Sequence, residues 1–345
     1  MTRLARDLDE ILERAREDFE TLRGARIFVT GGTGFVGSWL LESFVYANAR
    51  FALGARVVVL TREPSTFARV APHVAADDAV EFVRGDVRDF ADATGTFDAI
   101  VHAATPASAK INDETPLLMV DTVVNGMSRV LDIAERSGRI PFLLTSSGAI
   151  YGRQPPELHA VDETFSGGPD PLDARNAYHE SKRLSELLLA IAAQSRGVRA
   201  KIARLFAFVG PYLPLDRHFA IGNFIRDAMN GTTIQIGGDG TPVRSYLYAG
   251  DLTVWLWRVL ARGESGRAYN VGSERAIDIR ETARAVAACV EPRGTHAIRG
   301  MANNNCLPER YVPATRRART ELGLEEWTSL DDAIRRTIAW NRAET

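Results

Sequence analysis

The feature that most constrains the fold is the glycine turn inside "IFVTGGTGFVGSWLLESF", residues 27–44. An apolar β-branched run precedes the turn and a helical pattern follows it, and the glycines Gly31, Gly34 and Gly37 have the spacing G-x-x-G-x-x-G. Such glycines permit a tight turn and a close backbone approach, and the start of the helix offers free N–H groups to a pyrophosphate. The stretch therefore predicts a dinucleotide site that includes Phe35 and Val36. The alternative is a purely structural turn.

Short apolar runs alternate with helical patterns from residue 25 to about residue 205. We expect strands at residues 26–30, 56–60, 81–86, 99–104, 142–147 and 200–206, and helices at residues 37–47, 120–138 and 176–194. Continuous apolar strands separated by helices indicate a parallel sheet that is covered on both faces. The sequence thus predicts a doubly wound α/β (Rossmann) domain, in which ligands lie beyond the carboxyl ends of the strands.

The two ends of the chain show other patterns. Apolar residues at helical spacing between Leu4 and Leu22 predict an N-terminal amphipathic helix that packs on the body of the protein. From residue 206 onward glycine and proline interrupt the pattern, and helices are expected to begin near Ile221, Leu252, Ile279 and Leu330. We therefore expect three parts, at residues 1–23, 24–205 and 206–345, the last a smaller mixed α/β lobe.

Composition excludes several classes of protein. Lys and Arg number 42 against 44 Asp and Glu, a net charge of -2, so no basic field would gather nucleic acid or an anionic membrane. No apolar run has the length of a signal-peptide core or a membrane span. The two cysteines, Cys289 and Cys306, suggest neither a disulfide framework nor a metal site. The expected location is the cytoplasm.

The second and third strands end in residues that could contact the adenosine half of a dinucleotide. Arg62 stands where NAD-binding folds often carry an acid, and it could pair with the 2′-phosphate of NADP, although a solvated loop arginine is an equal alternative. Asp86, followed by Val87, could accept a hydrogen bond from the adenine amine or could simply cap a following helix. NAD and NADP both stay open.

A helical segment, "NAYHESKRLSELLLAIAAQ", places Tyr178 and Lys182 one turn apart on the same face. An ammonium within ~4 Å of a phenol could lower the tyrosine pKa from ~10 toward ~7, which suits a general base. The strand end "LLTSSGAIYG" offers a hydroxyl, from Ser146 or Ser147, that could hydrogen-bond an alcohol and then the carbonyl oxygen formed from it. The alternative for any single Tyr/Lys pair is a chance surface neighbour.

Together these motifs resemble the extended short-chain dehydrogenase/reductases, specifically the NAD-dependent epimerase/dehydratase family that acts on nucleotide-activated sugars. The resemblance covers residues 25–330 and rests on "TGGTGFVG", "GDVRD", "HAAT", "TSSGAIYG", "YHESK", "GDGTPVRSYLYAGDL" and "AYNVGS" in family order. It implies that Tyr178 is the base, that Lys182 binds the nicotinamide ribose, and that Ser147 is the hydroxyl partner. It also implies that Ala103, Ala104 and Thr105 line the cofactor channel, and that Asn223 and Arg244 in the 206–345 lobe hold the nucleotide diphosphate.

The residues after Ser147 separate the reactions of this family. Its 4,6-dehydratases carry Asp-Glu there and its decarboxylases usually carry glutamate at the second position, whereas this chain has Gly148 and Ala149. A 4-epimerase needs no further acid or base, so we expect C4 epimerisation through a transient 4-keto sugar. Two features restrain that expectation: Ala207 replaces an asparagine common in relatives, and His218 lies in an unfamiliar loop.

Three alternatives stay open beside the epimerase. They are a dehydratase with relocated catalytic groups, a decarboxylase or 4-ketoreductase, and a non-catalytic dinucleotide sensor. In relatives the helices at residues 120–138 and 176–194 pack against their symmetry mates, which implies a homodimer.

Overall fold

The computed structural model describes residues 3–91, 95–106, 109–217, 219–300 and 307–342, so His218 and Cys306 lie outside the described residues. The chain divides into two compact units. The first unit comprises Met1–Ile150, Pro169–Arg204 and Thr253–Tyr269. The second unit comprises Tyr151–Gly168, Leu205–Leu252 and Asn270–Thr345.

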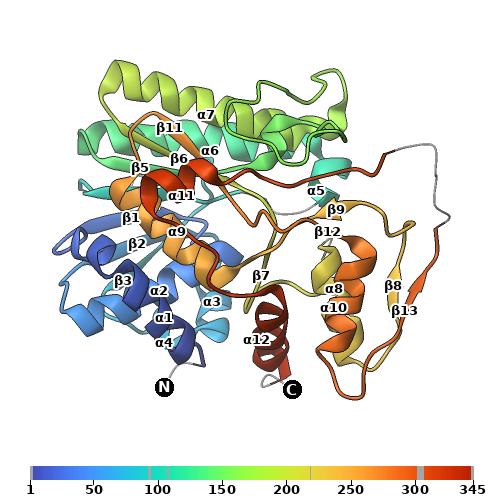
Figure 1. Cartoon of the computed structure of the whole chain (residues 1–345). Coiled ribbons are helices and arrows are strands. Elements are labelled where there is room, and N and C mark those ends of the chain that lie inside the picture. Colours follow the sequence, from blue (N-terminus) through green and yellow to red (C-terminus); the bar gives the residue numbers. More distant parts are fainter. Residues whose placement is uncertain (1–2, 92–94, 107–108, 218, 301–306, 343–345) are drawn as a thin grey trace. The chain divides into compact units, whose positions relative to one another are not determined.

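A seven-stranded sheet with the order β11-β6-β5-β4-β1-β2-β3 organises the first unit (Figure 1). The pairs β1–β2, β2–β3, β1–β4 and β4–β5 are parallel, as the continuous apolar strands predict. The strand bounds are β1 Arg26–Thr30, β2 Arg56–Thr61, β3 Val80–Arg84, β4 Ala99–His102, β5 Pro141–Ser147, β6 Arg199–Leu205 and β11 Arg267–Val271. The doubly wound α/β fold is confirmed.

Helices cover the sheet of the first unit. α6 and α7 lie side by side, and their Met127, Val130 and Leu189 join Phe28 and Phe142 of the strands in one buried core (Figure 1). The helices of this unit are α1 Ala5–Glu20, α2 Phe35–Phe51, α3 Pro64–Val70, α4 Pro72–Ala75, α5 Ala109–Glu114, α6 Pro116–Ser137, α7 Ala177–Arg196 and most of α9 Ala249–Arg262, with 3-10 turns at Gly148–Tyr151 and Ala174–Asn176. None of the helices in the described residues is both long enough and apolar enough to span a bilayer.

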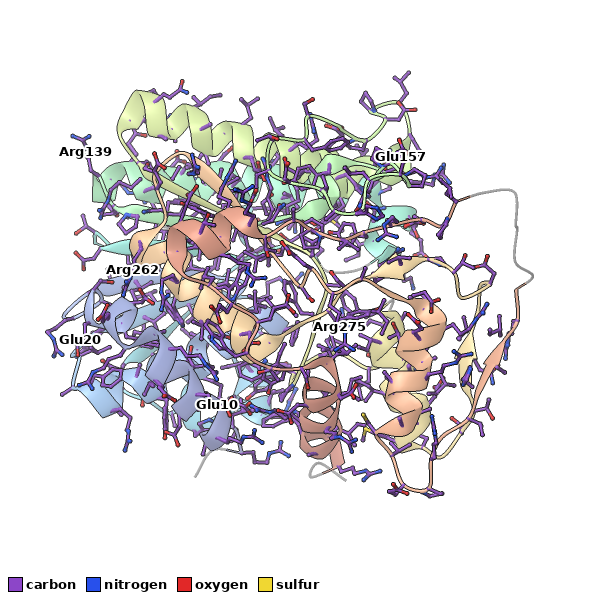
Figure 2. All side chains as sticks on the ribbon, viewed as in Figure 1. Glu10, Glu20, Arg139, Glu157, Arg262 and Arg275 are labelled. Carbon is purple, nitrogen blue, oxygen red and sulfur yellow. The ribbon has the colours of Figure 1, made fainter. Side chains whose placement is uncertain are left out.

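The N-terminal helix α1 forms as its apolar spacing predicts. Phe19 is fully buried and packs on Trp257 of α9, with ring centroids 5.2 Å apart. Beside it the buried Asp18 carboxylate accepts hydrogen bonds from Arg258 (2.6 Å) and Arg262 (2.5 Å); Arg262 is labelled in Figure 2. Apolar contact and a buried ion pair therefore attach α1 to α9.

The second unit is built from short elements. It holds α8 Ala220–Met229, α10 Ile279–Ala288, α11 Arg316–Leu322 and α12 Leu330–Arg342, and the strand pairs formed by β7 Phe208–Val209 with β10 Leu247–Tyr248, β8 Ile234–Ile236 with β13 His296–Ile298, and β9 Val243–Arg244 with β12 Ile277–Asp278. The helix starts at Ala220, Ala249, Ile279 and Leu330 agree with the four expected from the sequence. The short α11 was not expected.

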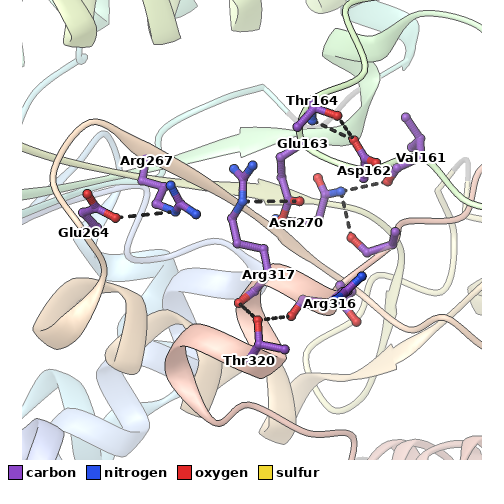
Figure 3. A network of polar contacts seen from close by, with 12 residues as sticks. Val161, Asp162, Glu163, Thr164, Glu264, Arg267, Asn270, Arg316, Arg317 and Thr320 are labelled. Carbon is purple, nitrogen blue, oxygen red and sulfur yellow. Dashed lines mark hydrogen bonds and ion pairs between the residues drawn. The ribbon is translucent and has the colours of Figure 1, made fainter.

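Two segments belong to a different unit from the one that their position along the chain would suggest. Thr253–Tyr269 belongs to the first unit, where β11 adds an edge strand to the sheet. Tyr151–Gly168 belongs to the second unit, where the buried Asn270 holds it. The side-chain nitrogen of Asn270 donates to the Val161 carbonyl at 2.9 Å (Figure 3). The side-chain oxygen of Asn270 accepts from the Tyr151 hydroxyl at 2.7 Å. Contacts between residues far apart in the sequence, and not sequence order, thus determine the unit to which each segment belongs.

Candidate active site

The glycine turn has the geometry that its sequence predicts. Gly31 has φ +71°, and a Cβ there would lie 2.5 Å from the Ala103 carbonyl carbon. A Cβ on Gly37 would overlap the Gly31 carbonyl oxygen. Gly34 is the N-cap of α2 and supplies no side-chain cap, so α2 begins at Phe35 and Val36 with amide groups available to an anion. The residues present therefore fit the pyrophosphate of a dinucleotide.

The loop after β4 lies directly against this turn. The Ala103 amide donates to the Thr30 carbonyl at 3.0 Å, and the Ala104 amide donates to the Thr30 hydroxyl at 3.3 Å. Thr105 follows and accepts a hydrogen bond from the Lys182 ammonium at 2.7 Å. The structure thus joins the glycine turn to the Tyr/Lys helix through Ala103, Ala104 and Thr105. Their role in lining the cofactor channel stays a prediction.

The adenosine-side residues follow two adjacent strands. Arg62 is exposed just after β2. Asp86 follows β3, and its carboxylate accepts from the Arg88 guanidinium at 2.8 Å; this bond, with Arg62 contributing, lowers the pKa of Asp86. Residues 87–89 form a turn and not a helix, and the Asp86 carboxylate caps this turn by accepting from the Arg88 amide at 3.0 Å, while its adenine role stays a prediction. Val87 is buried.

The structure brings Ser147, Tyr178 and Lys182 together at the end of β5. The Ser147 hydroxyl faces the Tyr178 phenol and lowers its pKa, and the Lys182 ammonium donates to the Thr145 carbonyl at 2.8 Å. The Lys182 Nζ lies 6.0 Å from the centre of the Tyr178 ring. A phenol, an alcohol and an ammonium therefore converge, which suits proton transfer to or from a bound hydroxyl.

The electrostatics of this group differ from the expectation. Burial raises the pKa of Tyr178, and the hydrogen bond from Ser147 only partly offsets that rise. We expected Lys182 to lower the phenol pKa, but its ammonium is directed to Thr105 and Thr145. Burial also lowers the pKa of Lys182 to about 8, with Glu186 opposing the shift. The buried His102 has its pKa lowered to about 3 by burial and by Lys182, so it is neutral.

A buried polar network behind the site was missed by the sequence analysis. The Ser146 hydroxyl donates to Glu186 at 2.5 Å, and Arg204 donates to both oxygens of the same carboxylate, at 2.7 Å from its closer nitrogen. The residues alone left Ser146 and Ser147 both open, while the resemblance implied Ser147; in the structure Ser146 bonds Glu186. The available signal was the repeated spacing of four residues through Tyr178, Lys182 and Glu186.

Asn223 and Arg244, the expected nucleotide ligands, both lie in the second unit. The Asn223 side-chain oxygen accepts from Arg226 at 3.2 Å near the start of α8. The Arg244 guanidinium donates to Glu309 at 2.7 Å and to the Val243 carbonyl at 3.0 Å. Both residues are partly buried.

The model of the NAD dependent epimerase/dehydratase family matches residues 27–272. This chain belongs to that family. UDP-glucuronic acid decarboxylase 2 of Arabidopsis thaliana is 30% identical over 312 residues, which are 90% of this chain and 67% of the plant protein. The family membership confirms an NAD(P)-dependent enzyme that modifies nucleotide sugars, which counts against a non-catalytic sensor.

Two solved structures of family members align over most of the chain. A dTDP-glucose 4,6-dehydratase from Streptomyces venezuelae, with NAD bound, has a TM-score of 0.75 and 25% identity, and the alignment covers 92% of this chain and 97% of that one. A UDP-glucose 4-epimerase from Thermotoga maritima has a TM-score of 0.77 and 21% identity, with 92% and 99% covered. The second likeness shows the shared fold.

Proposed function

We propose that the protein is a nucleotide-sugar 4-epimerase that acts through a transient 4-keto sugar. The observation that carries the proposal is the Ser147–Tyr178 pair beside Lys182 and the NAD-binding turn, followed by two residues that cannot exchange protons. Gly148 and Ala149 occupy the 3-10 turn directly after β5. The site therefore has groups for oxidation and reduction of a carbinol and, at these two positions, none for elimination.

The chain's own residues have defined roles in this proposal. Tyr178, as phenolate, accepts the proton of the sugar C4 hydroxyl, while Ser147 donates a hydrogen bond to the C4 oxygen. The family's dinucleotide supplies a reversible acceptor for the C4 hydride. Lys182 stays protonated and balances the developing negative charge. Tyr178 then returns its proton to the C4 oxygen after the keto sugar has exposed its other face.

Decarboxylation is the second candidate, because the decarboxylases of Arabidopsis thaliana reach 30% identity over most of this chain. A C4 oxidation would serve that reaction too, since a 4-keto hexuronic acid loses carbon dioxide readily. Against it stands Ala149, where the family resemblance implies a glutamate in decarboxylases. Glu180 does not replace it in an obvious way, because it pairs with Arg183 at 3.7 Å. A dehydratase and a 4-ketoreductase are further outcomes of the test.

We assign nucleotide binding to the 206–345 lobe, with Asn223 and Arg244 as ligands. Arg244 suits a diphosphate because its planar fork can bind two oxygens at once. Its present partner, Glu309, has a side chain that is 52% exposed and can exchange for a phosphate. Arg62 at the adenosine end leaves NADP open beside NAD. The cytoplasmic location stays a prediction that rests on composition.

We also propose a homodimer formed by α6 and α7. Apolar side chains are exposed on these helices, at Leu117, Leu118, Val120, Leu184, Leu187 and Ile191. Leu184, Leu187 and Ile191 share one face of α7 by their spacing. Exposed apolar side chains that gather on two adjacent helices mark an interface more often than a free surface.

The test is proton NMR of the purified protein mixed in turn with UDP-, dTDP-, GDP- and CDP-hexoses and hexuronic acids, without and then with added NAD or NADP. Interconversion of C4 epimers is the expected result. A pentose product with release of carbon dioxide would establish the decarboxylase instead, and a 4-keto-6-deoxy sugar would establish a dehydratase. The Tyr178→Phe variant is the control for background conversion.

A further inference from the structure

Three side chains on one face of α7 contact three consecutive residues of β5. The Tyr178 phenol lies by the Ser147 hydroxyl, which lowers its pKa, while Lys182 donates to the Thr145 carbonyl and Glu186 accepts from the Ser146 hydroxyl. Because the helix positions are four residues apart, they rise one turn at a time along the same face. The helix is thereby fixed to the end of the strand at three positions, and Glu186 provides the one that bonds Ser146.

Glu186 itself is held firmly. Arg204 of the neighbouring strand β6 donates from Nε at 3.0 Å and from a terminal nitrogen at 2.7 Å to the two carboxylate oxygens. The two side chains are only 12% and 14% exposed. Bidentate pairing fixes both the position and the plane of the carboxylate. Its hydrogen bond to Ser146 then restrains the residue directly before the catalytic candidate Ser147.

The charge of Glu186 also faces the Lys182 ammonium. The titratable and charged groups around Lys182 are Tyr178 and Glu186 on α7, with neutral His102 on β4, while Thr105 and Thr145 supply its hydrogen-bond acceptors. Burial disfavours the charged ammonium and lowers the pKa of Lys182, whereas the negative charge of Glu186 raises it. None of the groups that bond Lys182 directly is an anion, so the carboxylate one turn away is its main electrostatic support.

We propose that Glu186, anchored by Arg204, is a positioning residue that orients Ser147 through Ser146 and keeps the Lys182 ammonium charged in the buried site. This inference rests on the proposed roles of Ser147, Tyr178 and Lys182. Glu186 touches neither the Tyr178 phenol nor the turn that binds the dinucleotide, so it acts only through its neighbours.

The first test compares Glu186→Gln with Ser146→Ala across a pH profile. We expect kcat to fall about 10- to 100-fold in both variants with little change in KM, because misplacement by a fraction of an ångström slows chemistry without removing a substrate contact. Only Glu186→Gln should move the alkaline limb of the profile, downward by about one pH unit, because only it removes the charge. Glu135→Gln, which breaks the exposed pair with Arg196, is the matched control and should change neither.

A second test needs no turnover. A double-mutant cycle of Glu186→Gln and Lys182→Met, followed by urea unfolding, should show favourable coupling at pH 7 that declines by pH 10 as Lys182 loses its proton. If Glu186→Gln fails to fold because Arg204 loses the Glu186 carboxylate, the cycle is run with Glu186→Gln and Arg204→Gln changed together. Coupling that is absent, or independent of pH, overturns the inference.

The two tests separate the inference from the proposed function. Failure of the wild-type protein on every nucleotide sugar would count against the epimerase, while the unfolding cycle would still decide the role of Glu186. An active wild-type enzyme whose Glu186→Gln variant matches Glu135→Gln in kcat and pH profile would overturn the inference and leave the epimerase intact.

Discussion

Burial and the neighbouring Ser147 hydroxyl together set how readily the Tyr178 phenol ionises. Burial raises the pKa of Tyr178 and the Ser147 hydroxyl lowers it, so the two effects oppose each other. A base of raised pKa is strong once ionised but is rarely ionised at neutral pH. The activity should therefore increase with pH on its acid side, and the position of that limb should depend on Ser147.

Ser147→Ala should move the acid limb of kcat to higher pH. Loss of the hydrogen bond raises the pKa of Tyr178 further, so less phenolate is present at any pH below that value. The variant should also lose about 10²-fold in kcat, because the C4 oxygen loses a donor. Assays quenched at fixed times and analysed by NMR, from pH 7 to above pH 10, would measure both effects, because burial raises the pKa of Tyr178 above the ordinary tyrosine value of about 10. Ser147→Thr, which keeps the hydroxyl, should restore the limb, and an unmoved limb in Ser147→Ala would contradict the assignment.

Lys182 should make the free energy of unfolding depend on pH. Its pKa is lowered to about 8 from an ordinary value of 10.5, so the unfolded chain binds more protons than the folded chain between these values. Folded stability due to this residue therefore increases as pH rises from about 8 to about 10.5, by a total of about 3 kcal/mol.

Urea unfolding of the wild type and Lys182→Met at pH 7 and pH 10.5 would measure this dependence. Taking the difference between the two proteins removes the contributions of Tyr178, Tyr246 and Lys201, whose pKa values are also shifted by burial. The stability of the wild type relative to Lys182→Met should rise with pH. A difference that stays constant would show that Lys182 is hydrated in the folded protein.

At the scale of elements, the attachment of α1 through Asp18 gives a test of the N-terminal helix. Asp18→Ala should destabilise the protein by about 3–5 kcal/mol, because it removes the fully buried carboxylate that Arg258 and Arg262 share. Glu17→Ala is the control: Glu17 pairs with the same Arg262 at 2.7 Å but is 83% exposed, so its loss should cost under about 1 kcal/mol. If Asp18→Ala destabilised the protein as little as Glu17→Ala does, the buried ion pair of α1 would contribute little to the free energy of unfolding.

The six expected strands and the helix starts could be predicted because each depends on neighbouring residues, which form a continuous apolar run or a repeat with helical spacing. β11 was missed because "RAYNV" is short and its partner β6 lies more than sixty residues earlier. The local sequence of Tyr151–Gly168 does not predict its unit either, because Asn270, more than a hundred residues further along the chain, holds this segment by hydrogen bonds.

The candidate site shows the same division. The glycine spacing and the i, i+4 pair are local, so the turn and the Tyr178–Lys182 face followed from sequence. The hydrogen-bond partners of a flexible side chain depend on residues far away in the sequence, because packing decides the rotamer. Lys182 bonds Thr105 and Thr145, and Ser146 bonds Glu186. For the same reason the phenol pKa could not be derived from spacing alone.

At the scale of the whole molecule, the dimer proposed through α6 and α7 would remove the exposed apolar side chains of these helices from water. Leu187 is 56% exposed and Ile191 is 51% exposed on the same face of α7. Burying one leucine side chain on association contributes about 1.5–3 kcal/mol, whereas an arginine in its place would have to be desolvated without a partner.

Leu187→Arg should therefore convert a dimer at micromolar concentration into a monomer, measured by sedimentation velocity. Val70→Arg on α3, which adds the same charge at a position that is 48% exposed outside α6 and α7, should leave the dimer intact. The far end of α7 carries Tyr178 and Lys182, so a monomer that retains its activity would also show that each subunit holds a complete site. A wild type that sediments as a monomer would instead leave this apolar face without the proposed partner.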